Sequence, residues 1–298
     1  MDSKSGYKLV RSVKADTFDF ERLDQYTLLL QIGQRDFQAA AFDESKGTLE
    51  WLEDFALAEV SGHSAFLDTL KAIRFNSSVL SAGFWKSLVV CFKNTHFIQT
   101  PGELFDPETA IDYLRLNSRF SPDIEIPLAC TTGNKETVTL FGVPSEIRAW
   151  LDSAYAHTSR RFIHQSAALT ANALASQSKS ANTTMHMVTD RFRMHLIATG
   201  KKELLYYNQF AIKDFSDYNR YLSIAFHVLK LDPETCPVIL WGFITRQSPQ
   251  AQELKDLVRI LDFGQLNPGS HFGLGISGIQ DHQYPDLFAA YSVNKVEL

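Results

Sequence analysis

The chain has 298 residues, of which 45% are hydrophobic and 12% aromatic, and its formal net charge is −5. This composition is typical of a folded protein with two packed cores and excludes a disordered chain. The acidic balance weighs against non-specific binding to nucleic acid, and no apolar run approaches the roughly 20 residues of a membrane-spanning helix.

The first half of the chain is predicted to form one α/β lobe. Residues 1–24 are expected to be an N-terminal extension, and the lobe is expected to span residues 25–176. Alternating apolar runs and turn residues predict strands at residues 27–32, 37–42 and 48–57, with a turn at 43–47 and then a helix at 63–73 with one apolar face.

A segment at about residues 80–127 is interpreted as an insertion in this lobe. It contains predicted strands at 88–92 and 96–99 and a helix that begins at Pro107, since Asp before Pro is a common helix start. The lobe then resumes with a strand at residues 138–143, a helix at 146–154, a strand at 160–164 and a helix at 166–175.

The second half repeats the same order of elements after a polar linker at residues 177–184. Strands are predicted at residues 185–189, 192–198, 204–212, 237–244 and 258–261, and helices at 218–229, 250–257 and 285–291. In this comparison residues 140–144 correspond to residues 240–244. Each lobe, the second at residues 177–298, is therefore expected to hold a mixed five-stranded sheet with flanking helices.

Two copies of this unit, with an insertion after the first helix of the first copy, resemble the superfamily of actin, sugar kinases and heat-shock chaperones. The chain is similar to pilus-assembly proteins with an actin-like fold and to a bacterial family of uncharacterised proteins assigned to an actin-like ATPase fold. The resemblance covers about residues 25–295 and rests on the order of elements. It implies two ribonuclease-H-like lobes.

ATPases of this superfamily use an Asp-x-Gly turn between the first two strands of each lobe, where the acid holds magnesium and backbone amides hold phosphate. In the first lobe Gly33 is kept, but Gln31 stands at the acid position, and a neutral amide cannot neutralise a magnesium ion. Asp36 is nearby but out of register.

In the second lobe the turn contains Asp190 and Arg191 without a following glycine. Arg191 either contacts phosphate or is a solvated turn residue, and turn composition favours the second interpretation. The superfamily's later Gly-Gly pair, which packs against adenosine, is reduced to Gly242 followed by Phe243, whose ring would fill the space of a base.

We therefore expect a non-catalytic protein of the actin-like fold that does not hydrolyse ATP. It is expected to act as a protein-interaction scaffold with a degenerate nucleotide cleft. No cofactor, metal site or catalytic residue is expected. The alternative is a nucleotide-binding protein that retains ATP and magnesium through Gly33, Asp190, Arg191 and Gly242, with slow or no hydrolysis. A metal-dependent nuclease is a third hypothesis, but it would need clustered carboxylates at the position of Gln31.

Two further patterns bear on partners. Arg160 and Arg161 form a basic pair that is either the solvated edge of a sheet or a site for an acidic partner. Aromatic residues in the second lobe either form an exposed interface with an unknown protein or lie at the rim of the core because the chain is rich in Phe and Tyr. They are Tyr206, Tyr207, Tyr218, Tyr221, Tyr284, Phe288 and Tyr291.

The cysteines and the N-terminus indicate the compartment. Cys91, Cys130 and Cys236 are far apart and odd in number, which favours buried thiols in a reducing environment over disulfides or a zinc site. The N-terminus has no apolar segment of a secretory signal. A cytoplasmic protein without membrane insertion is the expectation.

Overall fold

The computed structural model describes residues 6–59, 62–132, 136–177 and 183–298, and the chain divides into two compact units. Unit 1 contains Met1–Ala168, Gly269–Gly278 and Ala290–Leu298, and unit 2 contains Leu169–Pro268 and Ile279–Ala289. The division thus falls within the helix that was expected to end the first lobe. The C-terminal part of the chain contributes to both units.

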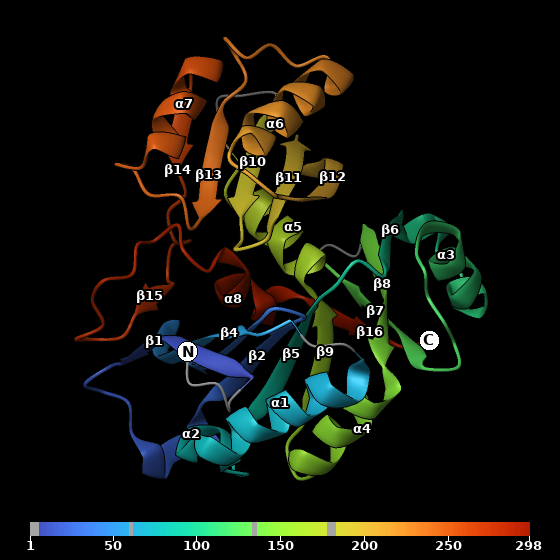
Figure 1. The fold of residues 1–298 in the computed structure, drawn as a ribbon, viewed down its shortest axis with the longest axis vertical. Helices are drawn as coiled ribbons and strands as arrows, with labels where there is room; N and C mark the ends of the chain where they lie inside the picture. The colour runs from blue at the N-terminus through green and yellow to red at the C-terminus, as the bar shows by residue number, and fades with distance from the viewer. Residues whose placement is uncertain (1–5, 60–61, 133–135, 178–182) are drawn as a thin grey trace. The chain divides into compact units, whose positions relative to one another are not determined.

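The main sheet of unit 1 contains the predicted meander of three antiparallel strands. In the order β1-β4-β3-β2-β5-β9, its strands are β1 (Tyr7–Lys14), β4 (Thr48–Leu57), β3 (Asp36–Asp43), β2 (Thr27–Gly33), β5 (Ser87–Lys93) and β9 (Arg160–His164), and β15 (His271–Phe272) also pairs with β4 (Figure 1). β5 lies parallel to β2, and β9 lies parallel to β5. Residues 7–14, expected in an N-terminal extension, pair with β4 instead.

The helices of unit 1 follow the apolar spacing of the sequence. They are η1 (Phe20–Gln25), α1 (His63–Asn76), α2 (Ser78–Ser81), α4 (Ser145–Ala154) and the first turn of α5 (Gln165–Ala175). The face of α1 that carries Leu67, Leu70 and Ile73 is buried, as its helical period predicts.

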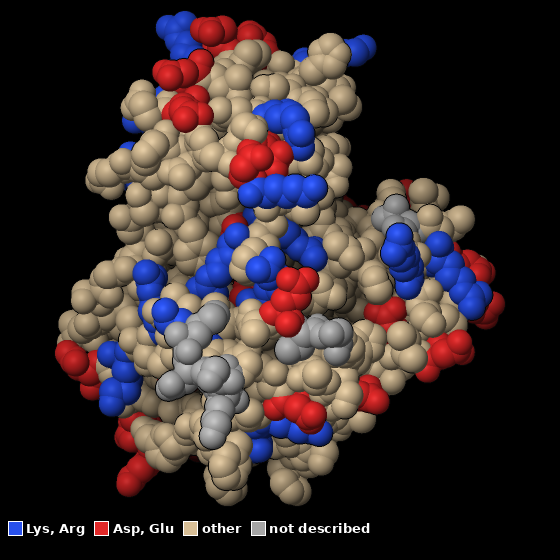
Figure 2. All heavy atoms as spheres, in the orientation of Figure 1, with Lys and Arg blue, Asp and Glu red and all other residues tan. Residues whose placement is uncertain are grey.

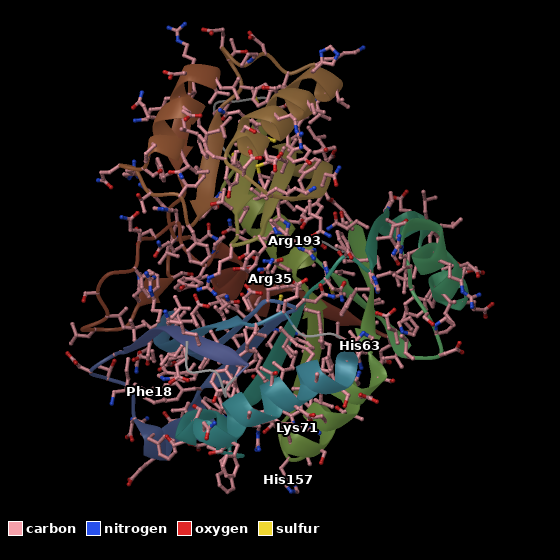
Figure 3. All side chains as sticks on the ribbon, viewed as in Figure 1. Phe18, Arg35, His63, Lys71, His157 and Arg193 are labelled. Carbon is pink, nitrogen blue, oxygen red and sulfur yellow. The ribbon has the colours of Figure 1, made fainter. Side chains whose placement is uncertain are left out.

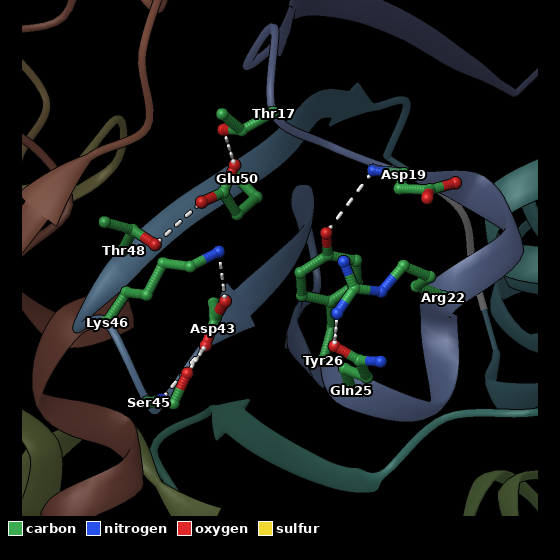
Figure 4. Close-up of polar contacts among 10 residues, drawn as sticks. All are labelled: Thr17, Asp19, Arg22, Gln25, Tyr26, Asp43, Ser45, Lys46, Thr48 and Glu50. Carbon is green, nitrogen blue, oxygen red and sulfur yellow. Dashed lines mark hydrogen bonds and ion pairs between the residues drawn. The ribbon is translucent and has the colours of Figure 1, made fainter.

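The turn between β3 and β4 is held by its own polar side chains (Figure 4). Asp43 accepts hydrogen bonds from the backbone N–H of Ser45 at 3.0 Å and from its hydroxyl at 2.6 Å, and it pairs with Lys46 at 2.9 Å. Gly47 has a φ of +68°, and a Cβ there would lie 1.8 Å from the carbonyl oxygen of Gly269. The turn predicted at residues 43–47 is thus confirmed, with glycine required by both conformation and space.

The insertion of unit 1 is a separate antiparallel sheet, and its extent differs from the prediction. Its order is β16-β7-β8-β6, with β16 (Asn294–Val296), β7 (Glu125–Thr131), β8 (Thr137–Pro144) and β6 (Phe97–Pro101), and it carries η2 (Gly102–Leu104), η3 (Pro107–Thr109) and α3 (Ala110–Asn117). The strand at 88–92, assigned to the insertion, is β5 of the main sheet. Conversely, β8, expected to resume the main sheet, belongs to the insertion.

In the described part of unit 2, the sheet has five strands, as predicted. Its order is β12-β11-β10-β13-β14, with β12 (Glu203–Ala211), β11 (Arg193–Gly200), β10 (Thr184–Thr189), β13 (Val238–Gly242) and β14 (Leu261–Phe263). The helices are α6 (Ser216–Leu229), α7 (Pro249–Leu257) and α8 (Pro285–Ala289), which is followed by η4 (Ala290–Ser292) of unit 1. One core cluster joins this sheet to α6 and α7, and a second joins it to α5.

The parallel strands give the true correspondence between the units. β13 lies parallel to β10 and places Gly242 opposite Thr189, just as β5 lies parallel to β2 and places Lys93 opposite Gly33. The match of residues 140–144 to 240–244 was therefore wrong. An apolar strand followed by a helix has the same sequence pattern in either sheet, so the pattern could not tell which strands pair.

Burial divides the aromatic residues that were considered for an interface into two groups. Tyr284 and Phe288 are buried. Tyr206, Tyr218 and Tyr221 pack against one core cluster of unit 2, and Tyr207 packs against the other. Within unit 1, Tyr291 stacks on Phe42 with ring centroids 5.0 Å apart. Burial therefore removes Tyr284 and Phe288 from an exposed interface, whereas the other five rings pack within the units and remain half-buried.

The buried imidazole of His186 is expected to make the stability of unit 2 depend on pH in the acidic range. The indole N–H of Trp241 donates to Nδ1 of His186 at 3.4 Å, and Nε2 lies 3.2 Å from the hydroxyl of Thr199, an arrangement that requires neutral imidazole. Burial lowers the pKa of His186 to about 3, below its ordinary value of 6.5. The unfolded chain therefore takes up a proton below about pH 6.5 that the folded chain refuses until about pH 3, so stability is complete above pH 6.5 and falls between these values.

We expect His186→Gln to remove part of this acid sensitivity. Between pH 6.5 and pH 4, wild-type stability should fall by up to about 1.4 kcal/mol per pH unit more steeply than that of the variant, because one proton is linked to unfolding. Denaturant midpoints measured across this range give the two slopes. Parallel slopes would show that His186 is not the linked group.

Candidate functional site

The first turn of unit 1 is built around a buried ion pair that sequence reasoning missed. Lys93, at the end of β5, pairs with the carboxylate of Asp36 at the start of β3. The side-chain amide of Gln38 donates to Asp36 at 3.1 Å and to Asp54 at 3.0 Å. All four side chains are buried. We call these four residues the Lys93 cluster.

Gly33 and Gln31 lie beside this cluster. A Cβ on Gly33 would lie 2.1 Å from a carboxylate oxygen of Asp36, so glycine is required here for the close approach of Asp36. Gln31 is 1% exposed, and its side-chain nitrogen has no hydrogen-bond partner among the described residues. The nearest acid is thus already neutralised by an ammonium group of the protein, and the residue at the acid position is a buried amide.

Within unit 2 the structure brings three of the expected site residues to one end of the sheet. Asp190 follows β10, and its carboxylate accepts from the backbone N–H of Arg191 at 2.7 Å. The guanidinium of Arg191 lies 5.5 Å from the ring centroid of Phe243, directly after Gly242. The fourth expected site residue, Gly33, belongs to unit 1.

The backbone amides at the end of β13 already have acceptors within unit 2. Gly242 donates to the carbonyl of His282 at 2.8 Å, and Phe243 donates to the carbonyl of Thr189 at 3.1 Å. The hydroxyl of Thr189 also accepts from Phe243 at 3.1 Å and from Ile244 at 3.4 Å. A phosphate-binding loop needs amides that point toward the ligand, whereas the amide of Phe243 bonds to β10 and that of Gly242 bonds to the segment that contains His282.

The close approach of β10 to β13 also requires glycine at position 242. Its φ is +93°, and a Cβ would lie 1.9 Å from the carbonyl oxygen of Thr189. The ring of Phe243 packs edge-on against Tyr284, with centroids 5.5 Å apart. The carboxylate of Asp36 and the backbone amides of Gly242 and Phe243 thus have partners within their own units.

Metal-ligating side chains do not gather elsewhere in the described ranges. No group of three or more His, Cys, Asp or Glu side chains there could hold a metal ion. The three cysteines are buried free thiols, as predicted, and burial raises the pKa of Cys130 to about 12. In the same part of the chain, no helix is both long and apolar enough to cross a membrane.

A cavity of about 640 Å³ lies in unit 1, beside the edge strand β9. We call it the β9 groove. It is lined by residues 127–129 of β7, Arg148 of α4, residues 156–160, Phe162 of β9, and residues 295–298 in and after β16. β9 and β16 are the terminal strands of their sheets in the described part of the chain, so Arg160 and Arg161 lie on a sheet edge.

The sequence signature described as "Protein of unknown function (DUF3822)" matches residues 15–261, which is most of the chain. The chain belongs to the DUF3822 family. No curated protein matches its sequence.

Solved structures define the fold. A Bacteroides thetaiotaomicron VPI-5482 protein with an actin-like ATPase fold and unknown function is 21% identical, with a TM-score of 0.71 over 86% of this chain and 96% of that one. The PilM-PilN type IV pilus biogenesis complex contains a chain that is 14% identical, with a TM-score of 0.57 over 89% of this chain and 96% of that one. The DUF3822 chain therefore has the actin-like ATPase fold, as the order of its elements predicted.

Proposed function

We propose that this chain is a non-catalytic protein of the actin-like fold that works by binding another protein, and that its nucleotide-binding turns are degenerate. The observation that carries the proposal is the Lys93 cluster. Lys93 neutralises Asp36, the acid nearest the first turn, so a positive charge of the protein occupies the neighbourhood where an ATPase needs a magnesium ion.

The fold neighbour PilM supports the protein-binding part by analogy, since it is described in a complex with PilN. Fold analogy alone does not transfer a function. A cytoplasmic location is part of this proposal, and the three buried thiols, which suit a reducing compartment, support it.

Retention of ATP through Gly33, Asp190, Arg191 and Gly242 is the second candidate function. Its support is the position of Asp190, Arg191 and Gly242 at one end of the unit 2 sheet. A nuclease has less support, because two-metal chemistry needs several clustered carboxylates and the described residues bring no such group together.

Isothermal titration with ATP and magnesium separates the first two functions. We expect no saturable binding of ATP with or without magnesium, because the acid and the amides that would hold the nucleotide have partners within the protein. Saturable binding that requires magnesium and is lost in Asp190→Asn would contradict the degenerate turns and establish the second candidate. Binding that survives in Asp190→Asn would lie outside the predicted residues.

A further inference from the structure

The β9 groove lies beside two terminal strands, and its charged side chains and their partners leave one positive charge in excess. β9 pairs with β5 on one side only, and β16 pairs with β7 on one side only, within the described residues. A free strand edge presents backbone N–H and C=O groups that another extended segment can pair with. The β9 groove has a volume of about 640 Å³, which suits the side chains of a short segment.

The charged side chains of the groove are unequal in number. Arg148, Arg160 and Lys295 line it; Glu297 pairs with Lys295 at 3.4 Å, and Asp152 pairs with both arginines, so one positive charge is in excess. Figure 2 shows that both signs of charge are found on the inserted sheet and around α6 and α7, so a local excess of cations is not general on these surfaces. An acidic ligand is complementary to this lining.

Arg148 is positioned to receive a carboxylate. Its guanidinium lies 4.0 Å from the ring centroid of Phe162, and its Nε donates to Asp152 at 2.8 Å. Arg160 binds the other oxygen of the same carboxylate through its own Nε at 2.9 Å. Two arginines thus share one acid, and the terminal nitrogens of Arg148 have no partner among the described residues. A stacked guanidinium with a free fork is preorganised for a carboxylate.

Thr158 supplies a second, independent indication of a ligand. It is 3% exposed and lines the groove, and its hydroxyl oxygen has no hydrogen-bond partner in the described part of the chain. A buried hydroxyl without a partner costs free energy, which a polar group bound in the groove would recover.

We propose that the β9 groove binds an extended segment of a partner protein, which pairs by its backbone with the outer edge of β9 and places an acidic side chain on Arg148. This inference rests on the proposed protein-binding function and names the chemistry of the partner. The basic pair at Arg160 and Arg161 then has two roles: Arg160 serves the groove, whereas Arg161 donates to the carbonyl of Tyr291 at 3.0 Å.

A displayed library of random linear peptides, selected on the purified full chain, tests this proposal. We expect the retained peptides to be enriched in Asp and Glu alternating with apolar residues, because successive side chains of an extended segment face opposite sides. A selected peptide should bind about tenfold more weakly to Arg148→Met, which keeps the stem over Phe162 but loses the charge. Methylation of its backbone nitrogens should also weaken binding.

Two further variants keep the outcome decisive. Lys295→Glu changes an exposed side chain of the groove and should weaken the same peptide even if Arg148→Met is unstable. Lys71→Glu, on α1 and outside the groove lining, is the matched control and should bind like the wild type. Figure 3 shows Lys71 on this helix and His157 in the groove-lining segment after α4.

The proposal is overturned if no peptide is retained, if retained peptides lack acidic residues, or if both groove variants bind like the wild type. It is also overturned if light scattering shows a dimer that Lys295→Glu dissociates, since a second copy would then occupy the groove. Failure here leaves the degenerate turns untouched, because those are tested by ATP titration alone.

Discussion

Replacing Lys93 with methionine is expected to lower the free energy of unfolding by about 3–5 kcal/mol, because removal of one member of a buried ion pair leaves the other charge without compensation. Methionine keeps most of the side-chain length, so the loss reports the ammonium charge. Asp36 would remain buried with only Gln38 as a hydrogen-bond donor of the cluster. Chemical denaturation followed by circular dichroism gives the change.

The control lies at the other end of the same strand. Lys86 directly precedes β5 and pairs with Glu44 at 3.1 Å, but both side chains are well exposed, so Lys86→Met should cost at most about 1 kcal/mol. In the double variant Lys93→Met with Asp36→Asn, part of the loss should be recovered. Equal costs for Lys86→Met and Lys93→Met, or no recovery in the double variant, would show that the Lys93 cluster does not act as a buried ion pair.

Gly242→Ala is expected to destabilise the protein by about 3 kcal/mol or more, since positive φ strain and a backbone clash act at the same position. The new Cβ would lie 1.9 Å from the carbonyl oxygen and 2.8 Å from the carbonyl carbon of Thr189. Neither atom belongs to a flexible side chain, so β13 must move away from β10. Thermal unfolding of the purified variant measures the loss.

Gly278→Ala separates the two causes. Gly278 has a φ of +76°, but a Cβ there would meet nothing within 4 Å, so only the conformational strain of about 1 kcal/mol is expected. If both variants lose the same stability, the close approach to Thr189 is unimportant. Gly242 would then be available for a role other than strand packing, including contact with a ligand.

Local patterns were sufficient for much of the fold. The meander of β2, β3 and β4, the buried face of α1 and the turn at Asp43 follow from spacing and turn chemistry within short stretches. Repetition of this order in the second half was enough to predict the actin-like fold. Such features depend on residues close in sequence, which the sequence displays directly.

The assignment of β5 and β8 to their sheets required the tertiary structure. Both are apolar strands of similar length. β5 belongs to the main sheet but is followed by β6 of the inserted sheet, and β8 belongs to the inserted sheet but is followed by α4 and then β9 of the main sheet. Which strand joins which sheet is set by hydrogen bonds between residues far apart in sequence, for example between β5 and β2. Periodicity carries no information on such partners.

The candidate sites show the same division. Gln31 and Phe243 could be recognised as departures from a motif, because the motif is local. Lys93, by contrast, resembles an ordinary turn lysine until parallel pairing places it opposite Gly33 and against Asp36. The β9 groove likewise joins β7, β9 and β16, which are separated by long stretches of chain. The sequence alone determined the elements and the lost motif residues, whereas tertiary structure decided which charges are buried together, because burial depends on long-range contacts.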